Sequence, residues 1–174
     1  GWISGKVSPS TLVHHSILGR ALQSPSIKAF TGAKRFLRWL AGRPNLSRRF
    51  ERQREWDWRN GELPEWYTQS DSSYADDAHD RKSQGGYVGG FRNQAVTTAV
   101  SGKTHRVAIS TYQAEAAWAS KAAKQAEYTR NVHQFLNILR PEPTILEVDN
   151  YATYINAGAP TTRWSASSKQ HDIE

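Results

Sequence analysis

The sequence contains no cysteine among its 174 residues. Disulfide bonds, thiolate zinc sites and cysteine nucleophiles are therefore excluded, and any bound metal ion must be held by oxygen or imidazole ligands. The six histidines include no pair spaced four residues apart, which disfavours a zinc site on a helix. A GxSxG motif is also missing, so nothing predicts a serine hydrolase of that type.

A long apolar run is absent as well. No stretch approaches the roughly 20 apolar residues that span a bilayer, and residues 1–11 lack the apolar centre of a signal peptide. We therefore expect no membrane partner and no export. The first residue is not methionine, and we expect the chain to be a fragment or a processed product of a longer protein.

The length and composition fit one domain with an extension. Hydrophobic residues make up 37% of the chain, which is enough for one packed core at this length. The net charge of +7 and the pI near 9.8 favour a polyanionic partner, because phosphates neutralised by lysine or arginine release counterions. The alternative is that the charge serves solubility alone.

A helix over residues 25–41 is predicted from its two ends. Ser24 and Pro25 supply an N-cap and a proline at the first helical position, and Gly42 supplies a stop. Basic and aromatic residues alternate after it, as expected for phosphate contact and stacking, or for a solvated connector that docks on the neighbouring domain. Asn60-Gly61 then marks a boundary, which divides the chain into a helical, basic segment 1–62 and a domain 63–174.

The second part of the chain alternates between strand and helix patterns. A long helix from Gln113 to about Leu139 precedes a short apolar strand, and a strand, helix, strand order predicts parallel pairing. The fold class is therefore α/β. The expected strands are Trp66–Ser70, Gly85–Gly90, Gln94–Val100, His105–Ser110 and Thr144–Val148.

Four carboxylates in this part are candidate metal ligands. Asp71 and Asp149 each follow an expected strand, and Glu115 lies in the first turn of the expected long helix. Each has an ordinary explanation as a turn residue, a helix-dipole partner or, for Asp172, a surface acid. Carboxylates from separate elements are costly to bring together unless cations neutralise them, so their combination favours a divalent metal site.

Ordered motifs in the same region resemble a known family. SDSSYADDAHDRKSQGGYV, HRVAISTYQAEAAWASKAAKQA, LEVDNYAT and SSKQHDIE are similar, in this order, to segments of the ribonuclease H domain of copia-type (Pseudoviridae) LTR retrotransposon polyproteins. The resemblance covers about residues 65–174. GAKRFLRWLAG, nearer the N-terminus, resembles the tail of the family's reverse transcriptase, known as the connection.

The resemblance implies a ribonuclease H-like fold, in which a mixed five-stranded sheet is flanked by helices, with an N-terminal helical extension. It implies a metal-dependent endoribonuclease that cuts the RNA strand of RNA–DNA hybrids with two Mg²⁺ or Mn²⁺ ions. Asp71 would be the bridging ligand, Glu115 and Asp149 would flank it, and Asp172 would be the fourth ligand. Tyr74 departs from the tryptophan that the family usually has after its first aspartate.

The implied partners are an RNA–DNA hybrid and an upstream reverse transcriptase core or a larger assembly. No YxDD motif is present, so DNA synthesis by this chain is not predicted. A retroelement product would act in cytoplasmic particles. The alternative is a domesticated, catalytically weak or inactive subunit with a structural or nucleic-acid-binding role. The expected nucleic-acid-binding residues are Lys34, Arg35, Arg38, Arg48, Arg49, Arg81, Lys82 and Asn150.

Overall fold

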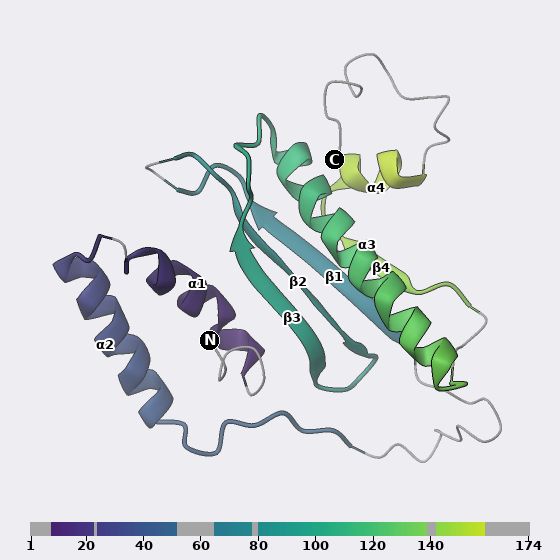
Figure 1. Cartoon of the computed structure of the whole chain (residues 1–174), viewed down its shortest axis with the longest axis horizontal. Coiled ribbons are helices and arrows are strands. Elements are labelled where there is room, and N and C mark those ends of the chain that lie inside the picture. Colours follow the sequence, from purple (N-terminus) through teal and green to yellow (C-terminus); the bar gives the residue numbers. More distant parts are fainter. Residues whose placement is uncertain (1–7, 23, 52–64, 78–79, 139–141, 159–174) are drawn as a thin grey trace.

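The computed structural model describes residues 8–22, 24–51, 65–77, 80–138 and 142–158. Within them the chain is α/β, with a mixed four-stranded sheet flanked by helices (Figure 1). This agrees, at that coarse level, with the expected architecture. The expected boundary between segment 1–62 and domain 63–174 lies outside the described residues.

The sheet has the strand order β3-β2-β1-β4. Strand β1 pairs antiparallel with β2, and β2 pairs antiparallel with β3. Strand β4 pairs in parallel, as the strand, helix, strand order predicted, but its partner is β1 rather than a strand directly before the helix. The strands are β1 (Trp66–Ser73), β2 (Gln84–Phe91), β3 (Val96–Lys103) and β4 (Ile145–Val148).

The expected fifth strand is not found among the described residues, and the prediction of a strand over His105–Ser110 is wrong. Val107 and Ile109 are both exposed, and no strand pairs with them. The alternation of apolar and polar residues in this segment therefore does not correspond to a strand of the sheet. The backbone N–H of Ile109 instead donates to Gln113 Oε1 at 2.8 Å. The segment is an irregular link that leads from β3 into the next helix.

Helix α3 (Thr111–Phe135) covers one face of the sheet, as Figure 1 shows. The Oγ of Ser110 caps it by accepting the backbone N–H of Gln113 at 3.1 Å. The helix begins two residues before the predicted start and ends before Leu139. Trp118 is its largest buried side chain and lies against Gly85, where an added Cβ would be 2.4 Å from the indole ring. Glycine at this position lets the helix approach the sheet closely.

The opposite face of the sheet is partly covered by a short 3₁₀ helix, η2 (Pro9–Thr11), and by α1 (Leu12–Arg20), which the sequence patterns did not predict. Gln84 precedes Gly85 in β2, and neighbouring side chains of a strand point to opposite faces. Its Nε2 donates to Ser16 Oγ on α1 at 3.4 Å.

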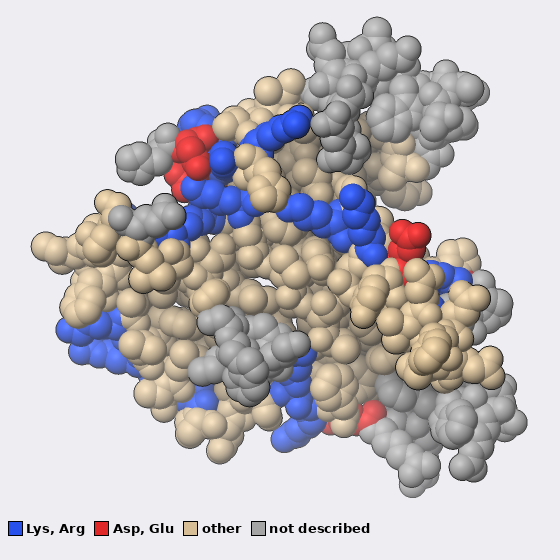
Figure 2. Space-filling model, viewed as in Figure 1, with Lys and Arg blue, Asp and Glu red and all other residues tan. Residues whose placement is uncertain are grey.

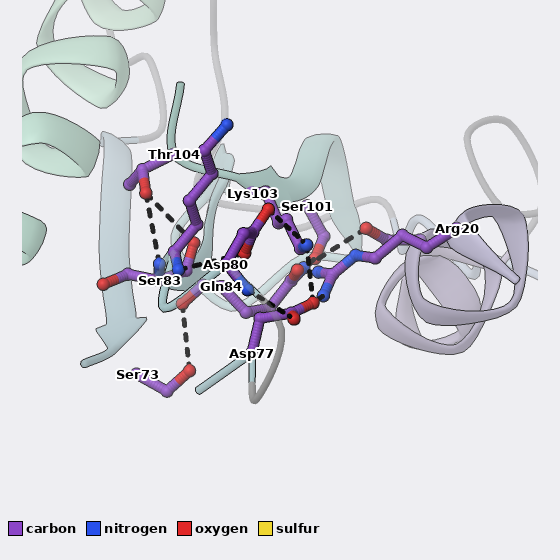
Figure 3. A network of polar contacts seen from close by, with 11 residues as sticks. Arg20, Ser73, Asp77, Asp80, Ser83, Gln84, Ser101, Lys103 and Thr104 are labelled. Atoms are coloured by element: carbon purple, nitrogen blue, oxygen red, sulfur yellow. Dashed lines mark hydrogen bonds and ion pairs between the residues drawn. The ribbon is translucent and has the colours of Figure 1, made fainter. Parts of the chain in front are cut away.

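An ion-pair network anchors the end of α1. Arg20 pairs with Asp77 in the loop after β1, and Lys103 at the end of β3 pairs with both Asp77 and Asp80 (Figure 3). The network joins three segments that are far apart in the sequence. Polar contacts therefore hold α1 on the sheet, while Val13 and Ile17 of the same helix remain about half exposed.

Helix α2 (Ile27–Ala41) confirms the helix predicted at residues 25–41, although its cap is Ser26 rather than Ser24. Among the helices and strands of the described residues, α2 contacts only α1. After it, Arg48 Nη1 donates to the carbonyl of Thr97 at 3.0 Å and holds the following segment beside β3. Helix α4 (Tyr151–Gly158) follows β4.

Candidate metal centre

Asp71 and Asp149 become neighbours through the register of β1 and β4. The parallel pairing ends at Ser70 and Val148, and each aspartate is the next residue along its strand. Asp71 was expected directly after its strand, but β1 runs on to Ser73 because β2 continues to pair with it. Asp71 is therefore still paired with β2, but it lies one residue past the end of the pairing between β1 and β4.

Glu115 reaches the same place from α3. The helix starts at Thr111, so Glu115 is in its second turn rather than the expected first turn, and pairing with the helix dipole explains it less well. Glu115 is buried, with 6% of its surface exposed. Its Oε1 accepts the backbone N–H of Ser72 at 3.2 Å.

The three carboxylates form a compact cluster. One ligand oxygen from each of Asp71, Glu115 and Asp149 lies within 4.8 Å of the others. Asp71 and Asp149 are exposed and Glu115 is buried, so the cluster opens to solvent on one side. Such a set of oxygen donors is suited to a hard divalent cation.

A second observation supports a cation at this place. Glu115 Oε2 is buried and has no hydrogen-bond partner among the described residues. A buried carboxylate oxygen without a partner is costly, and a metal ion in the cluster would supply one. The residues present therefore fit a divalent metal ion.

The electrostatics of Glu115 agree with this fit. Burial raises the pKa of the Glu115 carboxyl above its ordinary value, and the charges of Asp149 and Asp71 raise it further. The hydrogen bond from Ser72 acts in the opposite direction and lowers it. Without a cation, the cluster thus holds negative charges that burial and mutual repulsion both disfavour.

Two residues that the sequence patterns did not indicate bind the backbone of Ile109, in the link that leads into α3. Tyr74 Oη donates to the carbonyl of Ile109 at 3.1 Å, and Gln113 Oε1 accepts the backbone N–H of the same residue at 2.8 Å. The Ser110-x-x-Gln113 spacing is a capping-box pattern and could have indicated this role. Tyr74, noted before only as a departure from the family, links the end of β1 to the start of α3.

Of the other expected site residues, those that the structure describes do not join the cluster. Asp172 lies outside the described residues. Lys34, Arg35 and Arg38 are exposed on α2, which does not contact the sheet. Asn150 follows Asp149, but its Oδ1 accepts the backbone N–H of Thr153 at 2.9 Å in the first turn of α4.

The remaining basic residues lie on two separate segments. Arg49 is exposed beyond α2, and Arg48 contacts Thr97. Arg81 is exposed in the loop between β1 and β2 with a φ of 56°, and Lys82 beside it is half-buried. Figure 2 shows lysine and arginine side chains over α2 and in a band that runs from that loop towards α3.

The comparisons with known proteins identify no relative: no family model, no curated protein and no solved structure matches the chain. Among the helices in the described part of the chain, none has the length and apolar character needed to cross a membrane.

Proposed function

We propose that the chain is a metal-dependent endonuclease that cuts the RNA strand of RNA–DNA hybrids. The observation that carries the proposal is the cluster of Asp71, Glu115 and Asp149, in which a buried carboxylate oxygen has no other partner. The motif resemblance supplies the substrate. In the finer form of the proposal, the fold is ribonuclease H-like with a fifth strand, and Asp172 is the fourth ligand.

The residues of this site are proposed to have different roles, as metal ligands or as positioning groups. Asp71 is proposed as the central ligand, as the motif resemblance implies, with Glu115 and Asp149 of the same cluster as its partners. When bound by these residues, Mg²⁺ or Mn²⁺ would supply an activated water and neutralise charge on the leaving oxygen. The backbone N–H of Ser72 orients Glu115. Tyr74 and Gln113 bind the backbone of Ile109, in the link that leads into α3.

The basic side chains are proposed to hold the substrate. Arg81 and Lys82 are in the loop that directly follows the strand of Asp71, and Lys34, Arg35 and Arg38 present a separate basic surface. Contacts of this kind go to phosphates and carry no sequence information. The hybrid would be recognised through its shape and its 2′-hydroxyl groups rather than its sequence.

A second candidate function is hybrid binding without cleavage, in a domesticated subunit of a larger assembly. One observation favours it: the basic residues of α2 are exposed on an element that contacts neither the sheet nor α3. Binding could therefore persist where the metal centre does not act. This candidate and the nuclease predict different results in the same experiment.

The test is cleavage of an end-labelled RNA–DNA hybrid in Mg²⁺ and in Mn²⁺. The wild-type chain should cut the RNA strand, and Asp71→Asn should abolish cutting while leaving hybrid binding intact. Asp76→Asn is the matched control, because Asp76 is an exposed acid of the following loop outside the cluster. Binding without cleavage by the wild type would refute the nuclease and favour the second candidate.

A further inference from the structure

A cavity of about 420 Å³ lies between α1 and the sheet face that α1 partly covers. Pro9, Leu12 and Val13 form its wall on the helical side, and Val88 and Ala99 belong to its sheet side. Its volume is within the range of sites that bind small molecules. Apolar side chains and polar ones such as Gln69, Ser73 and Ser101 both line it.

Gln84 is one of the buried polar residues that line this cavity, with 6% of its surface exposed. Its Nε2 donates to Ser101 Oγ at 2.7 Å and to Ser16 Oγ, and Figure 3 shows Gln84 beside Ser101. Ser101 Oγ donates in turn to the carbonyl of Gly85, which fixes the orientation of the amide.

The Oε1 of Gln84 has no hydrogen-bond partner among the described residues. A buried amide oxygen normally accepts a hydrogen bond, and leaving it unpaired costs free energy. A ligand whose N–H or O–H group reaches Gln84 would supply the missing hydrogen bond.

Asp71 lines the cavity and also belongs to the carboxylate cluster, so the two sites adjoin at this residue. A ligand that spans both has an anionic group at the metal ions and a flat, largely apolar group with a hydrogen-bond donor beneath α1. A nucleotide has both parts: a phosphate, and a base whose faces are apolar and whose edge carries donors.

We propose that the cavity beneath α1 binds the base of an unpaired nucleotide whose phosphate lies at the Asp71 metal centre. The base must be unpaired, because a base within a duplex is stacked and its hydrogen-bonding edge is used by its partner. The ligand is therefore a mononucleotide or a single-stranded end. The inference rests on the proposed metal centre and adds a base-binding site to it.

The experiment titrates the whole chain, in Mn²⁺, with AMP and with ribose 5-phosphate, which carries the same phosphate without a base. Affinity is measured by calorimetry, and the side-chain amide of Gln84 is followed by NMR with diamagnetic Mg²⁺ in place of Mn²⁺. AMP should bind about tenfold more tightly than ribose 5-phosphate, equivalent to about 1.4 kcal/mol, and should shift the Gln84 amide signal. Equal affinities, or an unmoved Gln84 signal, would overturn the proposal.

Two variants separate the cavity from the metal centre. Val13→Trp adds a large side chain at a position that lines the cavity and is 47% exposed, so folding should tolerate it. It should remove the preference for AMP and leave Mn²⁺ binding unchanged. Gln84→Met should reduce the preference by removing the acceptor. A preference that persists in Val13→Trp would contradict the proposed place of the base.

The two proposals fail in different ways. If Mn²⁺ does not bind the wild-type chain, the metal centre is wrong, and the Gln84 signal with AMP in the absence of metal still decides whether the cavity binds a base. If Mn²⁺ binds and AMP shows no preference, the metal centre stands and the base-binding site is wrong.

Discussion

The backbone N–H of Ser72 donates to Glu115 Oε1 at 3.2 Å, beyond the last residue at which β4 pairs with β1. The bond joins the last part of β1, past its pairing with β4, to the second turn of α3. It satisfies one oxygen of Glu115 and leaves Oε2 buried without a partner among the described residues. The carboxylate is thereby oriented before any cation binds.

Divalent metal should stabilise the wild-type fold and not the Glu115→Gln variant. A cation that binds only the folded state at 100 times its dissociation constant adds about 2.7 kcal/mol to the free energy of unfolding. In EDTA the variant should be at least as stable as the wild type, because it removes a buried charge that repels Asp71 and Asp149. Thermal unfolding with Mn²⁺ and with EDTA measures both effects.

Glu127→Gln is the control for that comparison, because Glu127 is exposed on the same helix and lies outside the cluster. It should respond to Mn²⁺ as the wild type does. An equal rise of Tm in Glu115→Gln would show that the cation binds elsewhere.

Gly85→Ala should destabilise the fold by about 2–3 kcal/mol, a cost typical of an overpacked core. The added Cβ would be 2.4 Å from the Trp118 ring and 2.8 Å from the carbonyl oxygen of Asp71. Gly19→Ala in α1 is the control, because nothing lies within 4 Å of its added Cβ, and it should stabilise the helix by up to about 1 kcal/mol. Urea unfolding of both variants checks the prediction.

The cap of α3 should matter more for cleavage than for stability. Gln113→Ala removes the acceptor of the Ile109 N–H and should cost about 1 kcal/mol of stability. This contact fixes the start of α3, and Glu115 lies in the second turn of that helix. We therefore expect kcat for hybrid cleavage to fall as well. Gln134→Ala, at the exposed far end of the helix, should change neither urea unfolding nor kcat. A loss of kcat in both variants would contradict the argument.

Acidification should weaken the fold through His133. Burial lowers the pKa of His133 below its ordinary value of 6.5, and the charge of Arg130 lowers it further. The unfolded chain then binds the proton more readily than the folded chain. The contribution of neutral His133 to the free energy of unfolding is therefore complete above pH 6.5 and is lost as the pH falls through the folded-state pKa.

The variant that tests this is His133→Phe, which keeps a ring stacked on Phe91 but cannot titrate. Its urea stability should fall less between pH 7.5 and pH 5 than that of the wild type. Parallel losses in the two proteins would assign the acid sensitivity to other groups.

Replacing Lys34, Arg35 and Arg38 together by glutamine should weaken hybrid binding and make it less dependent on salt. Each phosphate contact contributes a slope of roughly −0.9 to log K against log salt on duplex DNA, and fewer contacts give a shallower line. The measurement is made in the Asp71→Asn background, so that the hybrid is not cut. An unchanged slope would remove α2 from the nucleic-acid interface.

Several elements could be predicted from the sequence because their signals are local. Ser24-Pro25 and Gly42 lie close to the two ends of α2, the expected helix from Gln113 covers most of α3, and the apolar strand before Asp149 corresponds to β4. The candidate ligands Asp71, Glu115 and Asp149 were selected from their places at the ends of expected elements. The alternating pattern at His105–Ser110 wrongly predicted a strand, because no strand of the described residues pairs with this segment.

The tertiary structure decided the features that depend on distant partners. Helix α1 has no side-chain cap and is held on the sheet by Ser16 and Arg20, whose partners Gln84 and Asp77 lie far along the chain. The sequence by itself determined which carboxylates were available and on which kinds of element. The register between β1 and β4 brought Asp71 beside Asp149, and the packing of α3 added Glu115, because pairing and packing are set by contacts between remote segments.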